Sequence, residues 1–239
     1  MDVSLVVPAY NEAGNLPALL DDLERLVSEA PCAVEVIVVD DGSTDGTGPL
    51  IRDHAARRPW LRAADNGGNL GMGATLLHGT SMATHPLVGW VMADRSDRLS
   101  DLWEMRRRLL AGADLVVASR AAAGGSYGTL VGVKSLGSRG FSAFARRLLG
   151  LPVHDATNAF RMFRRELTDN LALRRRDFAI SPEMVFRAVA AGRRVEEVPT
   201  VYAFRQHGMS DFALLRMGWA YLTLALRARL GRRPPAPTR

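Results

Sequence analysis

The chain has 239 residues, of which 47% are hydrophobic and 23% charged, and these values exclude a disordered or fibrous protein. Its formal net charge of +6 favours anionic partners, namely a phosphate-bearing substrate, an anionic membrane or nucleic acid. We exclude nucleic acid, because the basic residues are not interleaved with aromatic ones and no nucleic-acid-binding motif is present.

Strand and helix patterns alternate along the chain. Apolar, β-branched runs predict buried strands, and leucines at every third or fourth position predict an amphipathic helix after the first run. In chain order we expect strands at 3–9, 36–40, 61–63, 87–92, 113–118, 160–163 and 195–204, and helices at 15–28, 47 onward, 73–82, 135–149, 182–191 and 212–230. This alternation predicts an α/β fold with a mostly parallel sheet flanked by helices on both faces.

Polar residues follow the first two strands directly. Pro8, Tyr10 and Glu12 end the first run, and Asp40 and Asp41 end the second. In open α/β sheets, ligands bind in the crevice beyond the carboxyl ends of the strands. The sequence therefore predicts a site for a sugar nucleotide at this edge of the sheet.

The order of seven motifs resembles that of the inverting family 2 glycosyltransferases with a GT-A fold. Within this family the chain is most similar to the dolichyl- and polyprenyl-phosphate mannose synthase branch. The motifs are Pro8-Ala-Tyr-Asn-Glu12, Val39-Asp-Asp-Gly-Ser43, Asn69-Leu-Gly-Met-Gly73, Ala93-Asp-Arg-Ser-Asp97, Ala118-Ser-Arg120, Asp155-Ala-Thr-Asn-Ala-Phe-Arg161 and Arg205-Gln-His-Gly-Met-Ser210. The resemblance implies a GT-A domain over residues 1–211, followed by an amphipathic helix at 212–230 and a disordered tail at 231–239.

The resemblance also implies a donor site for a nucleotide sugar, a GDP- or UDP-hexose. The family's contacts with the base, ribose and diphosphate fall on Pro8, Tyr10, Glu12, Val39, Asp41, Ala93, Asp94, Arg205 and Ser210. The glycine-rich segment 69–73 either approaches this ligand or only leads into a helix, and both interpretations stay open. Asp211 stands where the family has a lysine, which reverses one charge near the diphosphate.

A divalent ion, Mg²⁺ or Mn²⁺, is the implied cofactor. Its ligands would be Asp94 and Ser96, while Met92 replaces the first carboxylate of the family's Asp-x-Asp motif. A thioether is a poor ligand for a hard cation, so we expect weakened metal binding. Three outcomes stay open: a metal held by Asp94, diphosphate and water, which we favour; positive charge from Arg95 instead; or loss of catalysis.

The resemblance places acceptor-phosphate contacts at Arg120, Lys134 and Ser138, and we take Asp94, Asp97 and Arg120 as the catalytic residues.

Asp97, Asp155 and Glu183 are candidates for a general base, and none is convincing. A phosphate acceptor is already anionic and needs no strong base, which favours it over a hydroxyl acceptor. Asp155 either contacts substrate or forms an ion pair with Arg161 that holds the loop between them.

We therefore expect hexosyl transfer, with inversion, to a polyprenyl (dolichyl-type) phosphate. Two alternatives stay open: transfer to a hydroxyl of a small molecule or glycan, and an inactive nucleotide-sugar-binding subunit. The absence of a signal-peptide pattern and the single cysteine indicate a cytoplasmic protein. The 212–230 helix either contacts the inner face of the membrane, which we favour, or packs on the domain or in a homo-oligomer interface.

Overall fold

The computed structural model describes residues 1–128, 133–202 and 214–229, and side chains for all of these except 133–135 and 214–218. The expected tail at 231–239 and the donor residues Arg205 and Ser210 thus lie outside the described residues.

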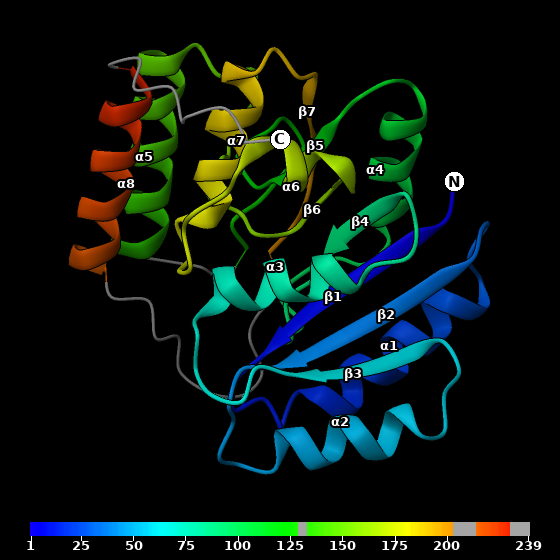
Figure 1. Cartoon of the computed structure of the whole chain (residues 1–239). Helices are drawn as coiled ribbons and strands as arrows, with labels where there is room; N and C mark the ends of the chain where they lie inside the picture. The colour runs from blue at the N-terminus through cyan, green and yellow to red at the C-terminus, as the bar shows by residue number, and fades with distance from the viewer. Residues whose placement is uncertain (129–132, 203–213, 230–239) are drawn as a thin grey trace.

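Within the described residues, seven strands form one sheet in the order β3-β2-β1-β4-β6-β5-β7 (Figure 1). The strands are β1 Val3–Ala9, β2 Val34–Asp40, β3 Leu61–Asp65, β4 Leu87–Trp90, β5 Leu115–Ser119, β6 Arg161–Arg164 and β7 Val195–Pro199. Strand β6 runs antiparallel to both of its neighbours, β4 and β5, and the other pairs are parallel. The expected α/β fold with a mostly parallel sheet is therefore confirmed.

Helices cover both faces of the sheet, as Figure 1 shows. They are α1 Leu16–Ser28, α2 Thr47–Ala55, α3 Met72–Met82, α4 Asp101–Leu110, α5 Val133–Leu149, α6 Glu166–Leu171, α7 Ile180–Ala190 and α8 Leu214–Arg229.

Strand β2 illustrates how the core is divided, because successive side chains of a strand point to opposite faces. Val36 and Val38 belong to the core cluster that includes buried residues of α1 and α4, while Ile37 and Val39 belong to the cluster that includes those of α3 and α7.

The sequence predicted most of these elements but missed two helices. All five leucines that define the inner face of α1 are buried, as expected. Helices α4 and α6 were not predicted, although Leu102, Met105 and Leu109 of α4 are buried at helical spacing. The strand expected at 195–204 leaves the sheet at Pro199, and one isolated bridge between Ser126 and Val201 follows it.

The C-terminal helix α8 packs on α5 and α7 at the edge of the molecule (Figure 1). Its Tyr221 ring lies 4.9 Å from the ring of Phe141 on α5, and Tyr221 and Ala225 are buried. The inner side of this helix is thus docked on the domain. No helix among the described residues combines the length and apolarity needed to cross a membrane.

Candidate active site

The carboxyl ends of β2, β1 and β4 lie side by side, because these strands are neighbours in the sheet and run parallel. This brings the predicted donor residues of three separate motifs to one edge. Pro8 and Val39 are register partners across β1 and β2. The Val39 side chain is fully buried in the core, so only its backbone can reach a donor. Tyr10, in contrast, is 38% exposed.

Glu12 sits in a hydrogen-bonded turn before α1. Its carboxylate accepts a hydrogen bond from Asn15 Nδ2 at 2.6 Å, and its backbone N–H donates to Thr47 Oγ1 at 2.9 Å. The turn is tied to the end of β2 through Asn11, whose Oδ1 accepts from the Thr44 N–H at 2.9 Å. The first donor motif is therefore fixed by contacts with the second.

Asp41 organises the loop that precedes α3. Its carboxylate accepts hydrogen bonds from the backbone N–H groups of Leu70 and Gly71, at 2.8 and 2.9 Å, and from Asn66 Nδ2 at 2.8 Å. The predicted ribose or base contact is thus also the group that shapes the glycine-rich loop. Gly42 has a φ of +73°, and a Cβ there would lie 2.6 Å from the backbone of this loop.

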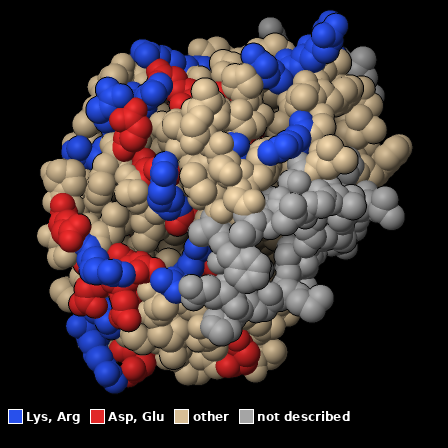
Figure 2. All heavy atoms as spheres, turned by 180° about the vertical axis from the view of Figure 1, so that it is seen from behind, with Lys and Arg blue, Asp and Glu red and all other residues tan. Residues whose placement is uncertain are grey.

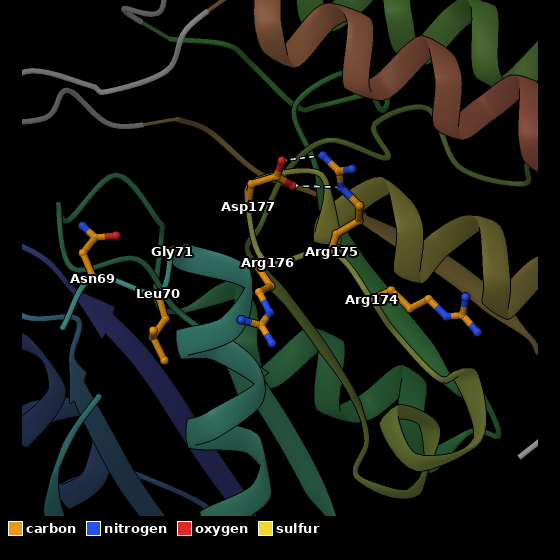
Figure 3. Close-up of a pocket in the computed structure, with 7 residues that line it drawn as sticks. All are labelled: Asn69, Leu70, Gly71, Arg174, Arg175, Arg176 and Asp177. Carbon is orange, nitrogen blue, oxygen red and sulfur yellow. Dashed lines mark hydrogen bonds and ion pairs between the residues drawn. The ribbon is translucent and has the colours of Figure 1, made fainter. Parts of the chain in front are cut away.

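A basic loop that the sequence analysis did not single out faces the glycine-rich loop. Residues 69–71 and 174–177 line a pocket of about 380 Å³ (Figure 3). Arg175 is paired with Asp177, while the side chains of Arg174 and Arg176 point apart (Figure 3). The two loops are joined by backbone, since the Gly73 N–H donates to the Arg176 carbonyl at 2.7 Å.

Glu183 on α7 anchors this basic loop. Its carboxylate accepts hydrogen bonds from the backbone N–H groups of Arg174 and Arg175, at 3.0 and 2.8 Å, and from Arg187 Nε at 2.8 Å. The side chain is buried. Glu183 therefore acts as a fixed structural acceptor and not as a carboxylate open to an acceptor hydroxyl.

The segment after β4 carries the predicted metal ligands. Asp94 Oδ1 accepts a hydrogen bond from the Ser96 N–H at 3.1 Å, and Ser96 is buried. The Met92 side chain is partly buried and packs against one of the two main core clusters. Within the described part of the chain, no cluster of three His, Cys, Asp or Glu side chains is arranged to hold a metal.

Arg95, the residue after Asp94, forms an ion pair with α1. Its Nε and Nη2 both donate to Asp22 Oδ2 of α1, at 3.0 and 2.7 Å. This ion pair engages the guanidinium with α1, and the alternative in which Arg95 supplies positive charge at the diphosphate stays a prediction. Its φ of +60° is rare for a residue with a side chain, and it marks a sharp turn between Asp94 and Ser96.

Asp97 has an unusual protonation equilibrium. Protein atoms surround its carboxyl, and this desolvation raises its pKa to about 8, with a further contribution from the negative charge of Asp94. A hydrogen bond of 2.8 Å from the Met92 N–H and the charge of Arg120 act in the opposite direction. At neutral pH most of the Asp97 carboxyl is therefore protonated.

A second polar cluster forms around Arg120 at the end of β5. Arg120 Nε donates to Asp155 Oδ2 at 2.7 Å, and its Nη2 donates to Asp155 Oδ1, Thr157 Oγ1 and Ser138 Oγ at 3.1, 3.0 and 3.3 Å. Burial alone would raise the pKa of Asp155, but the Arg120 guanidinium lowers it below its usual value. The Tyr127 ring lies 5.0 Å from the guanidinium carbon of Arg120.

This cluster joins two of the three predicted acceptor residues. Arg120 and Ser138 are in contact, while the side chain of Lys134 lies outside the described residues. Of the two interpretations of Asp155, the ion pair with Arg161 is wrong, because Asp155 pairs with Arg120. The Arg161 guanidinium is buried, donates to the carbonyls of Ser181, Ala159 and Asn158, and lies 5.6 Å from the Trp90 ring.

The mostly parallel sheet covered by helices on both faces, with acidic residues at its strand ends, is an α/β fold of the GT-A class. The fold resembles that of glucosyl-3-phosphoglycerate synthase from Mycobacterium tuberculosis, crystallised with Mn²⁺, UDP-glucose and phosphoglyceric acid. The TM-score is 0.73 at 21% identity, over 98% of this chain and 81% of that one.

The family model for glycosyl transferase family 2 matches residues 4–172, and the chain belongs to this family. It is therefore a glycosyltransferase.

Two curated relatives span almost the whole chain. Polyprenol monophosphomannose synthase of Mycolicibacterium smegmatis is 29% identical over 95% of this chain and 88% of its own. Undecaprenyl-phosphate mannosyltransferase of Micrococcus luteus is 29% identical over 97% of this chain and 100% of its own. The resemblance to the polyprenyl-phosphate branch is thus confirmed at the level of sequence similarity.

Proposed function

We propose that this glycosyltransferase moves a hexose from a GDP- or UDP-hexose, with inversion, to a polyprenyl-type phosphate. The observation that carries the proposal is the environment of Arg120. Asp155, Thr157 and Ser138 hold two of its three guanidinium nitrogens, and Nη1 has no hydrogen-bond partner within the described residues. An immobilised guanidinium with one free edge is well suited to bind a phosphate oxygen.

The donor would bind at the ends of β1, β2 and β4, with Tyr10, Glu12 and Asp41 near the nucleoside. Ala93 and Asp94 would lie at the diphosphate, and Arg205 and Ser210 remain predicted donor contacts. An acceptor phosphate on Arg120, with Lys134 as a further cation, would then approach from the end of β5.

A divalent ion would be held here by the carboxylate of Asp94, with Ser96 as the second predicted ligand. One carboxylate, the donor's phosphate oxygens and water satisfy the usual coordination of Mg²⁺ in nucleotide sites. When bound, the ion neutralises charge on the leaving nucleoside diphosphate. Ser96 contributes by its backbone N–H, which holds the Asp94 carboxylate in place.

Transfer itself requires no proton to be removed from a phosphate acceptor. A phosphate oxygen would form a bond to the anomeric carbon as the bond between that carbon and the diphosphate oxygen breaks, and in-line displacement inverts the configuration. The contacts of Glu183 support this choice of acceptor, because its buried carboxylate is already engaged by two backbone N–H groups and by Arg187. A hydroxyl acceptor would need a carboxylate base within its reach. The names of the two curated relatives agree with a phosphate acceptor.

The test is a transfer assay with a panel of GDP- and UDP-sugars, beginning with GDP-mannose, analysed by mass spectrometry. Each donor is given to a polyprenyl phosphate, to the matched dephosphorylated polyprenol and to soluble glycans. We expect a glycosyl phosphate only with the phosphorylated lipid, and NMR of the product will show an inverted anomeric configuration. Product on polyprenol or glycan instead would establish the hydroxyl alternative. Donor binding without transfer to any acceptor would establish an inactive subunit.

Arg120→Gln separates the acceptor role from donor binding. Loss of a charged phosphate contact should lower kcat/KM for the lipid phosphate at least about 100-fold, equivalent to about 3 kcal/mol, while the donor Kd stays within twofold. Arg98→Gln is the matched control, because Arg98 is half-exposed and pairs with Asp101. An unchanged acceptor KM in Arg120→Gln would contradict the assignment. On this proposal the enzyme works peripherally at the inner face of the membrane.

A further inference from the structure

The basic charge of the chain is concentrated in two adjacent helices. Helices α5 and α8 together contain seven Lys and Arg residues and no Asp or Glu. The remaining sequence has 24 basic and 25 acidic residues. The net charge of +6 therefore comes entirely from these two helices, and the rest of the chain is close to neutral.

Four arginines of these helices have no carboxylate partner in the described part of the chain. Arg146 and Arg147 on α5, and Arg227 and Arg229 on α8, are exposed and form no ion pair within the described residues. Arginines elsewhere on the surface are commonly paired, as Arg57 is with Asp53. Where α5 and α8 form the surface in Figure 2, basic side chains stand among uncharged ones without acidic neighbours.

The same helices expose the most accessible large apolar side chains. Leu136 is 72% exposed and Trp219 is 70% exposed, the highest values among the described large hydrophobic residues. Phe144 and Leu226 are 41% and 43% exposed.

Within each helix these residues share the outer side. Leu136, Phe144 and Arg147 of α5 follow one another at near-helical spacing, as do Trp219 and Leu226 of α8. The opposite side of each helix is packed: Ala145 and Ala225 are fully buried, and Phe141 contacts Tyr221.

We infer that this outer side of α5 and α8, defined by Leu136, Phe144, Arg147, Trp219, Leu226 and Arg227, docks on the surface of an anionic lipid bilayer. Apolar side chains flanked by unpaired arginines are the composition that binds the boundary between headgroups and acyl chains. A second copy of the chain is a poorer occupant, because two such basic faces would repel each other.

The position of α5 supports a bilayer on this side. Ser138, which accepts a hydrogen bond from Arg120, lies within one helical turn of Leu136. A lipid whose chains stay in the bilayer could therefore present its phosphate to the Arg120 cluster. This step of the inference rests on the proposed function, and it identifies the bilayer next to α5 as the source of the acceptor.

The test is co-flotation of the full-length protein with vesicles of phosphatidylcholine alone or with about 30% phosphatidylglycerol. We expect binding to the anionic vesicles and much weaker binding to the neutral ones. The double variant Arg146→Gln/Arg147→Gln should lower the partition constant about 10- to 30-fold, since each basic residue near an anionic surface contributes about fivefold. Its matched control is Arg52→Gln/Arg57→Gln, on α2 and in the turn that follows it, at the far end of the molecule (Figure 1).

A second pair of variants tests the apolar contribution. Leu136→Glu should abolish vesicle binding, whereas Leu110→Glu, at a 47% exposed leucine that ends α4, should leave it within twofold. Equal binding by Leu136→Glu and Leu110→Glu, or no preference of the wild type for anionic vesicles, would overturn the inference. The inference would also be overturned if the wild type formed a dimer and bound no vesicles, and Leu136→Glu converted that dimer to a monomer. A second copy of the chain would then be the partner of this surface.

An assay of transfer to a short-chain, water-soluble prenyl phosphate distinguishes failure of the membrane-docking inference from failure of the proposed function. Leu136→Glu should retain that activity and lose transfer to acceptor embedded in vesicles. Transfer to the soluble phosphate without vesicle binding by the wild type would refute the docking surface alone. Vesicle binding without transfer to either phosphate would refute the proposed function alone.

Discussion

Removing the carboxylate of Asp155 should destabilise the protein strongly. In Asp155→Ala, Arg120 loses the acceptor of its Nε and backbone N–H and one of the three acceptors of its Nη2. Thr157 loses the acceptor of its N–H and hydroxyl. The Asp155 side chain is 0% exposed and that of Arg120 only 10%, so water cannot replace these contacts fully. Breaking a buried pair in this way costs about 3–5 kcal/mol of unfolding free energy.

The assay is urea and thermal unfolding, followed by circular dichroism. For a chain of this length, a loss of that size lowers Tm by about 10 °C. The matched control is Asp53→Ala, because Asp53 also pairs with an arginine, Arg57, but both side chains are more than half exposed. Exposed pairs contribute about 0–1 kcal/mol, so the control should change little. Equal effects of the two substitutions would refute the argument from burial.

The pH dependence of stability supplies a second check on the role of Asp155. The pKa of Asp155 lies below its unfolded value in the folded protein, because Arg120 outweighs the effect of burial. Its ionised form therefore stabilises the fold above the unfolded pKa of about 4, and this contribution is lost as pH falls through the folded pKa. The stability gap between wild type and Asp155→Ala should be constant from pH 5 to 7 and narrow in stronger acid.

Three further predictions concern the donor side. A Cβ at position 73 would lie 2.7 Å from the Arg175 carbonyl oxygen, so Gly73→Ala should cost about 1–3 kcal/mol in urea unfolding, whereas Gly140→Ala, in open space on α5, should stabilise. Burial raises the Asp97 pKa to about 8, so the free energy of unfolding of the wild type should fall, relative to that of Asp97→Asn, as the pH rises from the unfolded to the folded pKa. The expected slope is about 1.4 kcal/mol per pH unit, and a constant difference from pH 5 to 7 would contradict this. Met92→Asp should tighten Mg²⁺-dependent donor binding about tenfold in calorimetry, and EDTA should remove the gain; equal affinities with and without EDTA in both proteins would exclude a metal at Asp94.

Periodicity predicted the elements whose apolar residues stand out from their surroundings. The runs that became β1 and β2 are continuous, and the leucines of α1 repeat at helical spacing. Periodicity did not predict helix α4, because its buried residues are separated by charged ones, including three consecutive arginines. These buried residues are Leu102, Met105 and Leu109. The short helix α6 has only two buried residues, too few to define a face.

Motif order predicted which residues gather at the sheet edge, but not their partners. Asp155 and Arg161 are close in sequence, which suggested a local pair. The sheet order β4-β6-β5 instead sets the segment before β6 against the end of β5, and Asp155 meets Arg120 from 35 residues away. Likewise, only the folded chain brings Asp22 to Arg95. Contacts of this kind depend on strand order, which no local pattern encodes.

Helix α5 connects the proposed membrane-docking surface, on its outer side, with the proposed phosphate-binding site at Arg120, on its inner side. Ser138 faces inward to Arg120, and Leu136, two residues earlier and thus about 200° around the helix, faces outward. A single rigid helix therefore fixes the distance between the lipid surface and the phosphate-binding guanidinium. If so, changes on the outer side should alter how often a lipid phosphate arrives, seen in KM for embedded acceptor, whereas changes at Arg120 or Asp155 should also lower kcat. A kcat defect in Leu136→Glu with soluble acceptor would show that the two sides are not separable in this way.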